Sequence, residues 1–211
     1  MVGTLLLVGT LYLAFMAGVI SQRAIPTEFR SSLPITTAVV FGVTACLSGL
    51  QFIFPAILAD LRRNGELFTS GQWWRLLTPL FVQDGGLPGT VFNLLSLLAL
   101  GVAAERLLGW RRWLLLYFGT GVVSEIIAYT LLPQGSAGNS IANFGLAAGL
   151  LVVGLTSRLH AGILVAALGS LCGLALLAMG DLHGAAFLVG SLLAVGAAAV
   201  TRKPLNRASL L

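Results

Sequence analysis

The sequence predicts an all-α protein, a polytopic bundle of transmembrane helices, on two observations. Of the 211 residues, 57% are hydrophobic and only 9% are charged, and the mean hydropathy is +0.97. A soluble domain carries about 25% charged residues, so the composition excludes a soluble domain beside the apolar segments. The apolar residues also gather in runs near the ~20 residues that span the hydrocarbon core. A lone span must satisfy its own backbone polar groups, so each run is predicted to be a helix.

The first elements to justify are the spans themselves. The uncharged stretch 126–157 is too long for one span, and Pro133, Gly135 and Gly138 interrupt it. We therefore expect two helices joined there by a short hairpin turn. With that division, the seven predicted spans are 2–20, 35–58, 85–104, 113–131, 140–157, 160–180 and 182–201.

One predicted connection, 59–84, is long and of mixed charge, and it contains GQWWRLLTPLF. Trp73, Trp74 and Arg75 are typical of side chains that anchor at the headgroup level. A simple interfacial belt is one interpretation. The length of the connection also permits a structured lid or wedge in the outer leaflet.

The distribution of basic residues predicts the orientation. If the N-terminus is outside, nine of the twelve Lys and Arg residues fall in cytoplasmic segments, as the positive-inside rule requires. This bias also accounts for the net charge of +5 without a nucleic-acid partner. The first run lacks a basic n-region, so we interpret it as a retained helix rather than a signal peptide. We expect a multi-pass protein of a bacterial plasma membrane with a cytoplasmic C-terminus. The nine residues are Arg23, Arg30, Arg106, Arg111, Arg112, Arg158, Arg202, Lys203 and Arg207.

Five polar side chains, on four helices, are predicted to lie in the outer half of the bilayer, where polar groups are costly. Each has a structural explanation. Ser140 is typical of a helix N-cap after a Gly-rich turn, His183 of a polar residue at a membrane entry, and Asn93 of an interhelical hydrogen bond. Asn143 is interpreted as a packing residue. Glu125 is expected to be either neutral and hydrogen-bonded or paired, and no chemistry is assigned to it.

Taken together, these residues indicate a hydrolytic site. A serine hydroxyl such as that of Ser140 needs a base to remove its proton, and a neutral imidazole such as that of His183 is the usual one. The unsatisfied N–H groups at the start of the Ser140 helix, with the Asn93 amide, are candidate oxyanion donors. No carboxylate need orient the histidine, and Asp181, although near in sequence, need not touch it. The site must hold water in a cavity that opens to the outer face.

From about Gly71 to Ala194 the sequence resembles the rhomboid family of intramembrane serine proteases. GQWWRLLTPLF resembles the family's first loop, and GNSIANFG resembles its serine motif. FNLLSLLALGVAAERLLGWRRWLLLYFGTG is similar to the second and third core helices. HGAAFLVGSLLA resembles the last helix, in which Ala186, Gly190 and Ala194 allow close helix approach.

The resemblance implies a six-helix core with one additional helix. Residues 1–34 would form the extra N-terminal transmembrane helix and a cytoplasmic linker, residues 35–203 the core, and residues 204–211 a cytoplasmic tail. It also implies transmembrane protein substrates in the lipid bilayer, cut near the outer face, and no cofactor, metal or nucleic acid. The oligomeric state is left open.

Site residues are carried over by motif position. Ser140 would be the nucleophile and His183 the general base, and Phe144 would pack against the histidine. The remaining assignments are Asn93 and Asn139 as oxyanion residues and Gly138 as a supporting residue.

Two positions depart from the family motifs. Ile141 stands where the family has a glycine, so we expect it to press Ser140 away from His183, with the small alanines that follow His183 compensating. Gly89 stands where the family usually has a histidine, which removes a donor whose loss typically costs ~10²–10³ in kcat. A non-cleaving rhomboid-like protein that binds transmembrane helices is therefore the alternative hypothesis. A transporter or channel would need paired intramembrane charges or inverted repeats, and only Glu125 points that way.

Overall fold

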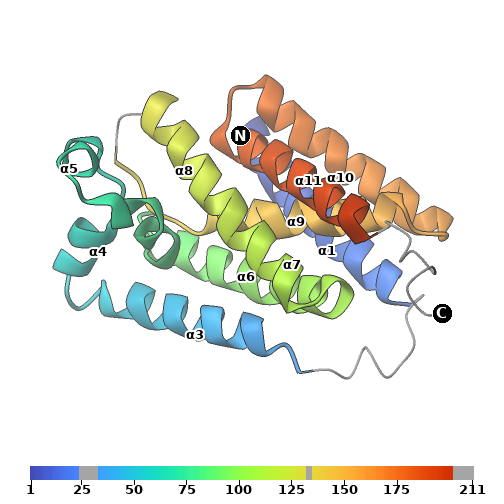
Figure 1. The fold of residues 1–211 in the computed structure, drawn as a ribbon, viewed down its shortest axis with the longest axis horizontal. Helices are drawn as coiled ribbons and strands as arrows, with labels where there is room; N and C mark the ends of the chain where they lie inside the picture. The colour runs from blue at the N-terminus through green and yellow to red at the C-terminus, as the bar shows by residue number, and fades with distance from the viewer. Residues whose placement is uncertain (24–32, 132–134, 202–211) are drawn as a thin grey trace, which may run out of the picture.

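The computed structural model describes residues 1–23, 33–131 and 135–201, and all regular secondary structure within them is helical. This confirms the predicted fold class, a polytopic helical bundle (Figure 1). Five helical stretches are long and apolar enough to cross a membrane: α1 (Val2–Gln22), α6 (Gly86–Leu108), Trp110–Thr130, α10 (His160–Ala178) and Leu182–Ala199 of α11 (Leu182–Thr201). Two shorter apolar helices are α3 (Ile35–Leu50) and α9 (Ser140–Leu155). Residues 24–32 of the predicted linker, residues 132–134 of the predicted hairpin turn and the tail from 202 fall outside the described residues.

The stretch Trp110–Thr130 is continuous but not uniform. It begins as α7 (Trp110–Leu114), passes through a π-helical turn at Leu115–Gly119, and continues as α8 (Thr120–Leu131). A π-turn widens the helix locally, and such turns often occur at functional sites.

The second predicted span is divided in the structure. α3 ends at Leu50, and Pro55 precedes a short helix, α4 (Ala56–Leu61). Proline restricts the residue before it to extended conformations, which explains why the apolar pattern through 58 does not form one helix. The N-terminal end of α3 is held by Glu105 of α6, whose carboxylate accepts backbone N–H groups of Thr36 and Thr37 at 2.9 and 2.7 Å.

The long connection after α3 is structured rather than a plain belt. It contains α4, α5 (Gly65–Thr69) and two 3₁₀ turns at 73–76 and 78–81. Trp73 and Trp74 are exposed, as the headgroup interpretation predicts, but Arg75 is only 3% exposed. Its guanidinium donates to the backbone oxygen of Arg62 and to the side chain of Gln72, so Arg75 ties the loop together instead of facing headgroups.

Helix α9 forms the centre of the bundle. Almost every residue between Ile141 and Gly154 is buried, as expected for a helix that is apolar on all sides. It packs against α1, α6, α10, α11 and the π-turn, whereas α3 lies at the periphery against α6 (Figure 1). The extra helix α1 is an integral part of this packing, because it contacts α6, α9 and α10.

A very close helix approach in the core lies at Gly145 of α9. A Cβ added there would lie within van der Waals overlap of the Leu116 carbonyl oxygen in the π-turn, and one on Gly190 of α11 would lie 2.8 Å from the Gly145 Cα. Backbone therefore meets backbone on both sides of Gly145. This packing fixes the start of α9 relative to the start of α11.

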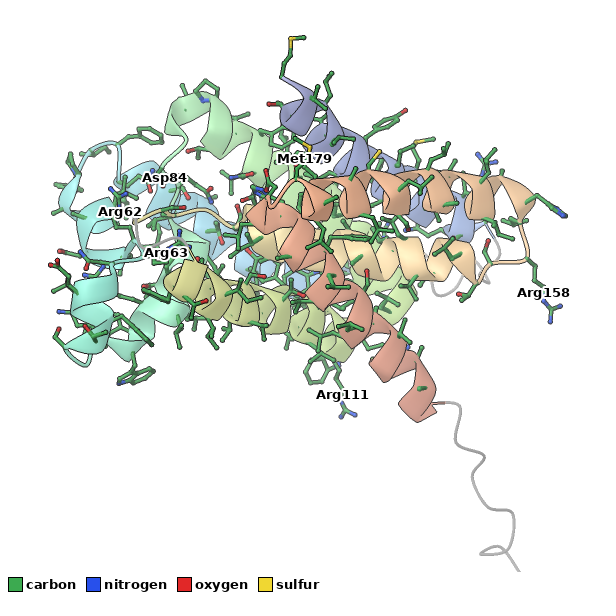
Figure 2. All side chains as sticks on the ribbon, turned by 90° about the horizontal axis from the view of Figure 1, so that it is seen from above. Arg62, Arg63, Asp84, Arg111, Arg158 and Met179 are labelled. Carbon is green, nitrogen blue, oxygen red and sulfur yellow. The ribbon has the colours of Figure 1, made fainter. Side chains whose placement is uncertain are left out.

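Charged side chains mark the two ends of the bundle. Arg62, Arg63 and Asp84 gather at one end, and Arg158 lies at the other (Figure 2). The first end is also where α9 begins, because Asp84 and Arg63 bond to the segment just before Ser140. In the orientation predicted from the basic residues, this is the outer end.

Candidate active site

The structure brings Ser140 and His183 together from two different helices. Ser140 is the first residue of α9 and His183 the second of α11, and Ser140 Oγ lies 2.9 Å from His183 Nε2. The Phe144 ring, fully buried one turn below the serine, has its centroid 5.2 Å from that of the imidazole. A hydroxyl and an imidazole nitrogen at this separation have the geometry of a nucleophile and its general base.

Ile141 does not separate the pair. Its side chain is buried, 4% exposed, while the Ser140–His183 contact is kept. The expectation that Ile141 presses Ser140 away is wrong, because the close approach of α9 and α11 occurs deeper in the membrane, at Gly145 and Gly190.

Asp181 contacts His183, although nothing in the sequence required this contact. Its Oδ1 lies 2.7 Å from His183 Nδ1 and accepts the backbone N–H of His183 at 2.8 Å. The hydrogen bond from His183 is the main cause that lowers the pKa of Asp181, so the carboxylate is ionised at neutral pH. An ionised Oδ1 holds the proton on Nδ1 and leaves the Nε2 lone pair facing Ser140. The available sequence signal was an aspartate at a preferred N-cap position two residues before the histidine.

The two predicted oxyanion residues are placed differently. Asn93 Nδ2 donates to the side-chain oxygen of Gln83 at 2.8 Å, and Asn93 lines the cavity beside Ser140. The Asn139 side chain is fully buried and accepts from Gln83 Nε2 at 2.8 Å, and it does not line that cavity. Sequence reasoning missed Gln83, which contacts both asparagines.

Gly138 leaves space beside the serine. Its φ of +157° lies at the edge of the region that favours glycine, and an added Cβ would lie 3.6 Å from Asn93 Nδ2 and 3.8 Å from Ser140 Oγ. The volume that a side chain would take is therefore open between a donor and the hydroxyl. An oxyanion formed at Ser140 has room there.

A cavity of about 190 Å³ opens at the Ser140–His183 pair, which is room for several waters. On one wall Arg63 and Glu125 form an ion pair at 3.1 Å, with side chains 4% and 3% exposed. Of the two expectations for Glu125, the structure shows the paired one. Among the described residues, no three His, Cys, Asp or Glu side chains are arranged to hold a metal ion. The lining residues are Arg63, Asp84, Gly85, Asn93, Glu125, Ser136, Ala137, Gly138, Ser140, Ile141, Leu182 and His183.

The segment that leads into Ser140 is tethered to the long loop. Arg63 N–H donates to the Ser136 oxygen at 3.0 Å, and Gly138 N–H donates to the Pro79 oxygen at 3.0 Å. Between them, the Ala137 N–H donates to the Asp84 carboxylate at 2.8 Å. The loop therefore sets the path of the chain into the site.

Comparison with known proteins identifies a family and several relatives to which the chain is similar. A family model, the Rhomboid domain, matches residues 70–203. The chain is 40% identical over 96 residues to Rhomboid protease GluP of Bacillus subtilis, covering 46% of this chain and 19% of that protein. It is 37% identical over 83 residues to Rhomboid-like protease 2 of Toxoplasma gondii (38% and 29%), and 35% identical over 79 residues to Rhomboid-type serine protease 2 of Emericella nidulans (36% and 16%).

The chain thus spans less than a third of the length of these three relatives. The matched domain nevertheless takes in more than half of the 211 residues, and it contains Ser140, His183 and the helices that bring them together. The helical membrane fold and the domain match lead to one conclusion: this chain belongs to the rhomboid family.

Proposed function

We propose that the chain is an intramembrane serine endopeptidase that cleaves transmembrane helices near the outer membrane face, with Ser140 as nucleophile and His183 as general base. The observation that supports this most strongly is the 2.9 Å contact between Ser140 Oγ and His183 Nε2 beside a cavity. The names of the relatives, all rhomboid proteases, agree with this chemistry.

The residues present account for each proton in the reaction. Ser140 Oγ bonds to the scissile carbonyl carbon while its proton passes to Nε2, and Asp181 stabilises the resulting imidazolium through Nδ1–H. The imidazolium then gives the proton to the leaving amine as the C–N bond breaks. A water from the cavity, deprotonated by His183, hydrolyses the acyl-enzyme and releases Ser140.

The negative charge on the carbonyl oxygen needs donors that are already in place. The second N–H of the Asn93 amide and the unsatisfied N–H groups at the start of α9 supply them, next to the space left by Gly138. The positive end of the α9 dipole adds to this stabilisation. We assign Asn139 a supporting role, because its side chain does not line the cavity.

Because α9 begins below the start of α6, the position of Ser140 sets the depth at which a transmembrane helix would be cut. Asn143 Nδ2 donates to the backbone carbonyl oxygen of Asn93 at 3.0 Å. The fourth residue of α9 therefore lies at the same depth as the eighth residue of α6. At 1.5 Å per residue, Ser140 lies about 6 Å below the first residue of α6. We therefore place cleavage just below the outer surface, in substrates whose helix is weakened there by small or helix-breaking residues.

The test is cleavage in vesicles by the purified chain. The substrate is a reporter with one transmembrane helix that carries small residues near its outer end, and mass spectrometry locates the cut. Wild type is expected to cleave near that end, and Ser140→Ala and His183→Ala are expected to be inactive. Ser136→Ala is the matched control, because this serine lines the same cavity. Equal cleavage by Ser140→Ala and wild type would refute the proposal.

Gly89, where the family's donor histidine is absent, favours one alternative, a non-cleaving protein that binds transmembrane helices. That alternative predicts no cleavage by wild type, together with co-purification of membrane partners that survives both Ser140→Ala and His183→Ala. Cleavage by wild type that depends on Ser140 would eliminate it.

A further inference from the structure

The side chain of Gln83 bridges the two asparagines of the site. Its Oε1 accepts from Asn93 Nδ2 and its Nε2 donates to Asn139 Oδ1, both at 2.8 Å. Gln83 is 1% exposed and comes from the long loop, whereas Asn93 belongs to α6 and Asn139 directly precedes α9. We propose that Gln83 is a positioning residue that orients the Asn93 amide toward the oxyanion; this inference rests on the proposed protease function.

The backbone of Gln83 is itself held in place. The Gln51 side chain at the end of α3 donates to the Gln83 carbonyl and accepts the Gln83 N–H at 3.0 Å. Gln51 is also buried, at 6% exposed. Because both backbone polar groups of Gln83 are engaged, its side-chain amide is presented to the asparagines from a fixed base.

The bridge requires an amide. It needs one acceptor and one donor on the same end group, which a glutamine supplies, whereas a glutamate only accepts and a methionine does neither. One of the two Asn93 N–H groups is used in the bond to Gln83, which fixes the plane of the amide and leaves the other N–H available. The Gln83 oxygen would lie 3.3 Å from a Cβ on Gly138, so the bond between Gln83 and Asn93 lies beside the residue that precedes the serine segment of α9.

Because residue 89 is a glycine, the bridge through Gln83 should matter more for the reaction. A glycine at this position supplies no side-chain donor, so Asn93 is the one side chain that we assign as a donor to the oxyanion beside Ser140. An oxyanion site stabilises charge only when its donors are held in position before the reaction. Misplacing that one amide should therefore slow the reaction more than in a site with several side-chain donors.

The experiment measures how fast a fluorophosphonate probe modifies the purified full chain at saturating probe concentration. In this reaction Ser140 Oγ bonds to phosphorus while its proton passes to His183 Nε2, the P–F bond breaks and fluoride leaves, and the phosphoryl oxygen occupies the oxyanion space. Gln83→Met is expected to lower the maximal labelling rate by about 10- to 100-fold, because small misplacements of a catalytic group have costs of this order. The probe concentration for half-maximal rate should stay unchanged. Ser48→Ala is the control. This variant also loses a hydrogen bond to the long loop, the one from Ser48 to the Phe81 oxygen, but Ser48 does not bond to either asparagine.

A double-mutant comparison separates positioning from general structure. If Gln83 acts through Asn93, then Gln83→Met should have almost no further effect in an Asn93→Ala background. Thermal unfolding of each variant is measured alongside. Gln83→Glu is the second variant if Gln83→Met fails to fold, and it too should label slowly, because it cannot donate to Asn139.

The outcomes distinguish the two proposals. Labelling of Gln83→Met at the wild-type rate, or a full additional loss in the Asn93→Ala background, would overturn the positioning role while the protease assignment stands. Absence of Ser140-dependent labelling in wild type would overturn both. A slow Gln83→Met with normal half-saturation, and no added loss without Asn93, would establish the role.

Discussion

Two kinds of contact position Ser140: helix packing along α9, which follows the serine, and hydrogen bonds to the segment that precedes it. Below the serine, α9 meets α11 and the π-turn through close backbone contacts at Gly145 and Gly190. Above it, residues 135–138 are held by hydrogen bonds to the long loop and lie beside the buried Arg63–Glu125 pair. The lower side is specified by excluded volume and the upper side by polar partners.

This difference predicts which substitutions should affect folding, which should affect stability and which should affect the reaction rate. Tightly packed backbones cannot relax around an added atom, so changes below Ser140 should prevent folding. Above it, removing a partner leaves a buried polar group unsatisfied, so the cost should be recovered when the second partner is also removed. Side chains that we assign to the reaction itself should change the reaction rate more than the stability.

The largest expected effect breaks the lower side. Gly145→Ala places a Cβ against the Leu116 carbonyl oxygen, which is backbone and cannot move aside. We expect a loss of at least about 4 kcal/mol of stability, seen as little or no folded protein in gel filtration and thermal unfolding. Gly196→Ala on α11 is the control, because nothing lies within 4 Å of its added Cβ. Equal stability of the two variants would mean that backbone contact does not position α9.

The next effect tests the upper side. Arg63→Met leaves Glu125 as an uncompensated buried carboxylate and should lower the unfolding free energy by about 3–5 kcal/mol. The double variant Arg63→Met with Glu125→Leu removes both charges and should recover most of that loss. Stability measured for the single and double variants gives the coupling. A double variant no more stable than Arg63→Met would show that pairing is not what the upper side depends on.

Asn93→Ala should separate rate from stability. Removal of an oxyanion donor typically lowers kcat by ~10²–10³, and we expect this loss in the cleavage assay with only a small fall in melting temperature, caused by the Gln83 oxygen that loses its donor. Thr90→Ala on the same helix is the matched control, because its buried hydroxyl bonds to the Gly86 oxygen of its own helix. A parallel fall in melting temperature and rate would instead make Asn93 a structural residue.

The smallest expected effect concerns Asp181. Asp181→Asn keeps an N-cap acceptor but removes the charge facing the imidazolium, and we expect a loss on the order of tenfold, a part of what a general base supplies. The pKa of Asp181 is lowered, chiefly by its bond from His183, so its contribution to stability exists above the ordinary pKa and is lost as pH falls through the lowered value. The variant should lack that part of the acid-side decline in melting temperature. An unchanged rate would show that Nδ1 needs no carboxylate.

Hydropathy and charge were sufficient for most of the spans and for placing Ser140 and His183 at one end of their helices, and the resemblance of the motifs was sufficient for the family. These are local properties, since a membrane span is read from one continuous run. The family prediction is confirmed by the domain match. The division of the second span at Pro55 was missed because the apolar pattern continues through it.

The polar partners of the site were not predictable in the same way. Gln83, Arg63 and Asp181 contact their partners through loop conformations, and Arg63 and Glu125 are 62 residues apart. Hydropathy shows no signal for which loop side chain turns inward. The close approach at Gly190 was predicted, but its partner Gly145 was not, since the motif directed attention to Ile141 and the π-turn that receives Gly145 has no periodic pattern to reveal it.

The most direct test of the central claim is to identify the modified residue after fluorophosphonate treatment. Digestion and mass spectrometry of the labelled chain are predicted to find the adduct on Ser140 in wild type, and no adduct in His183→Ala. An adduct on another serine of the same cavity, such as Ser136, or labelling of Ser140 that is undiminished without His183, would contradict the pairing of the two side chains as nucleophile and base.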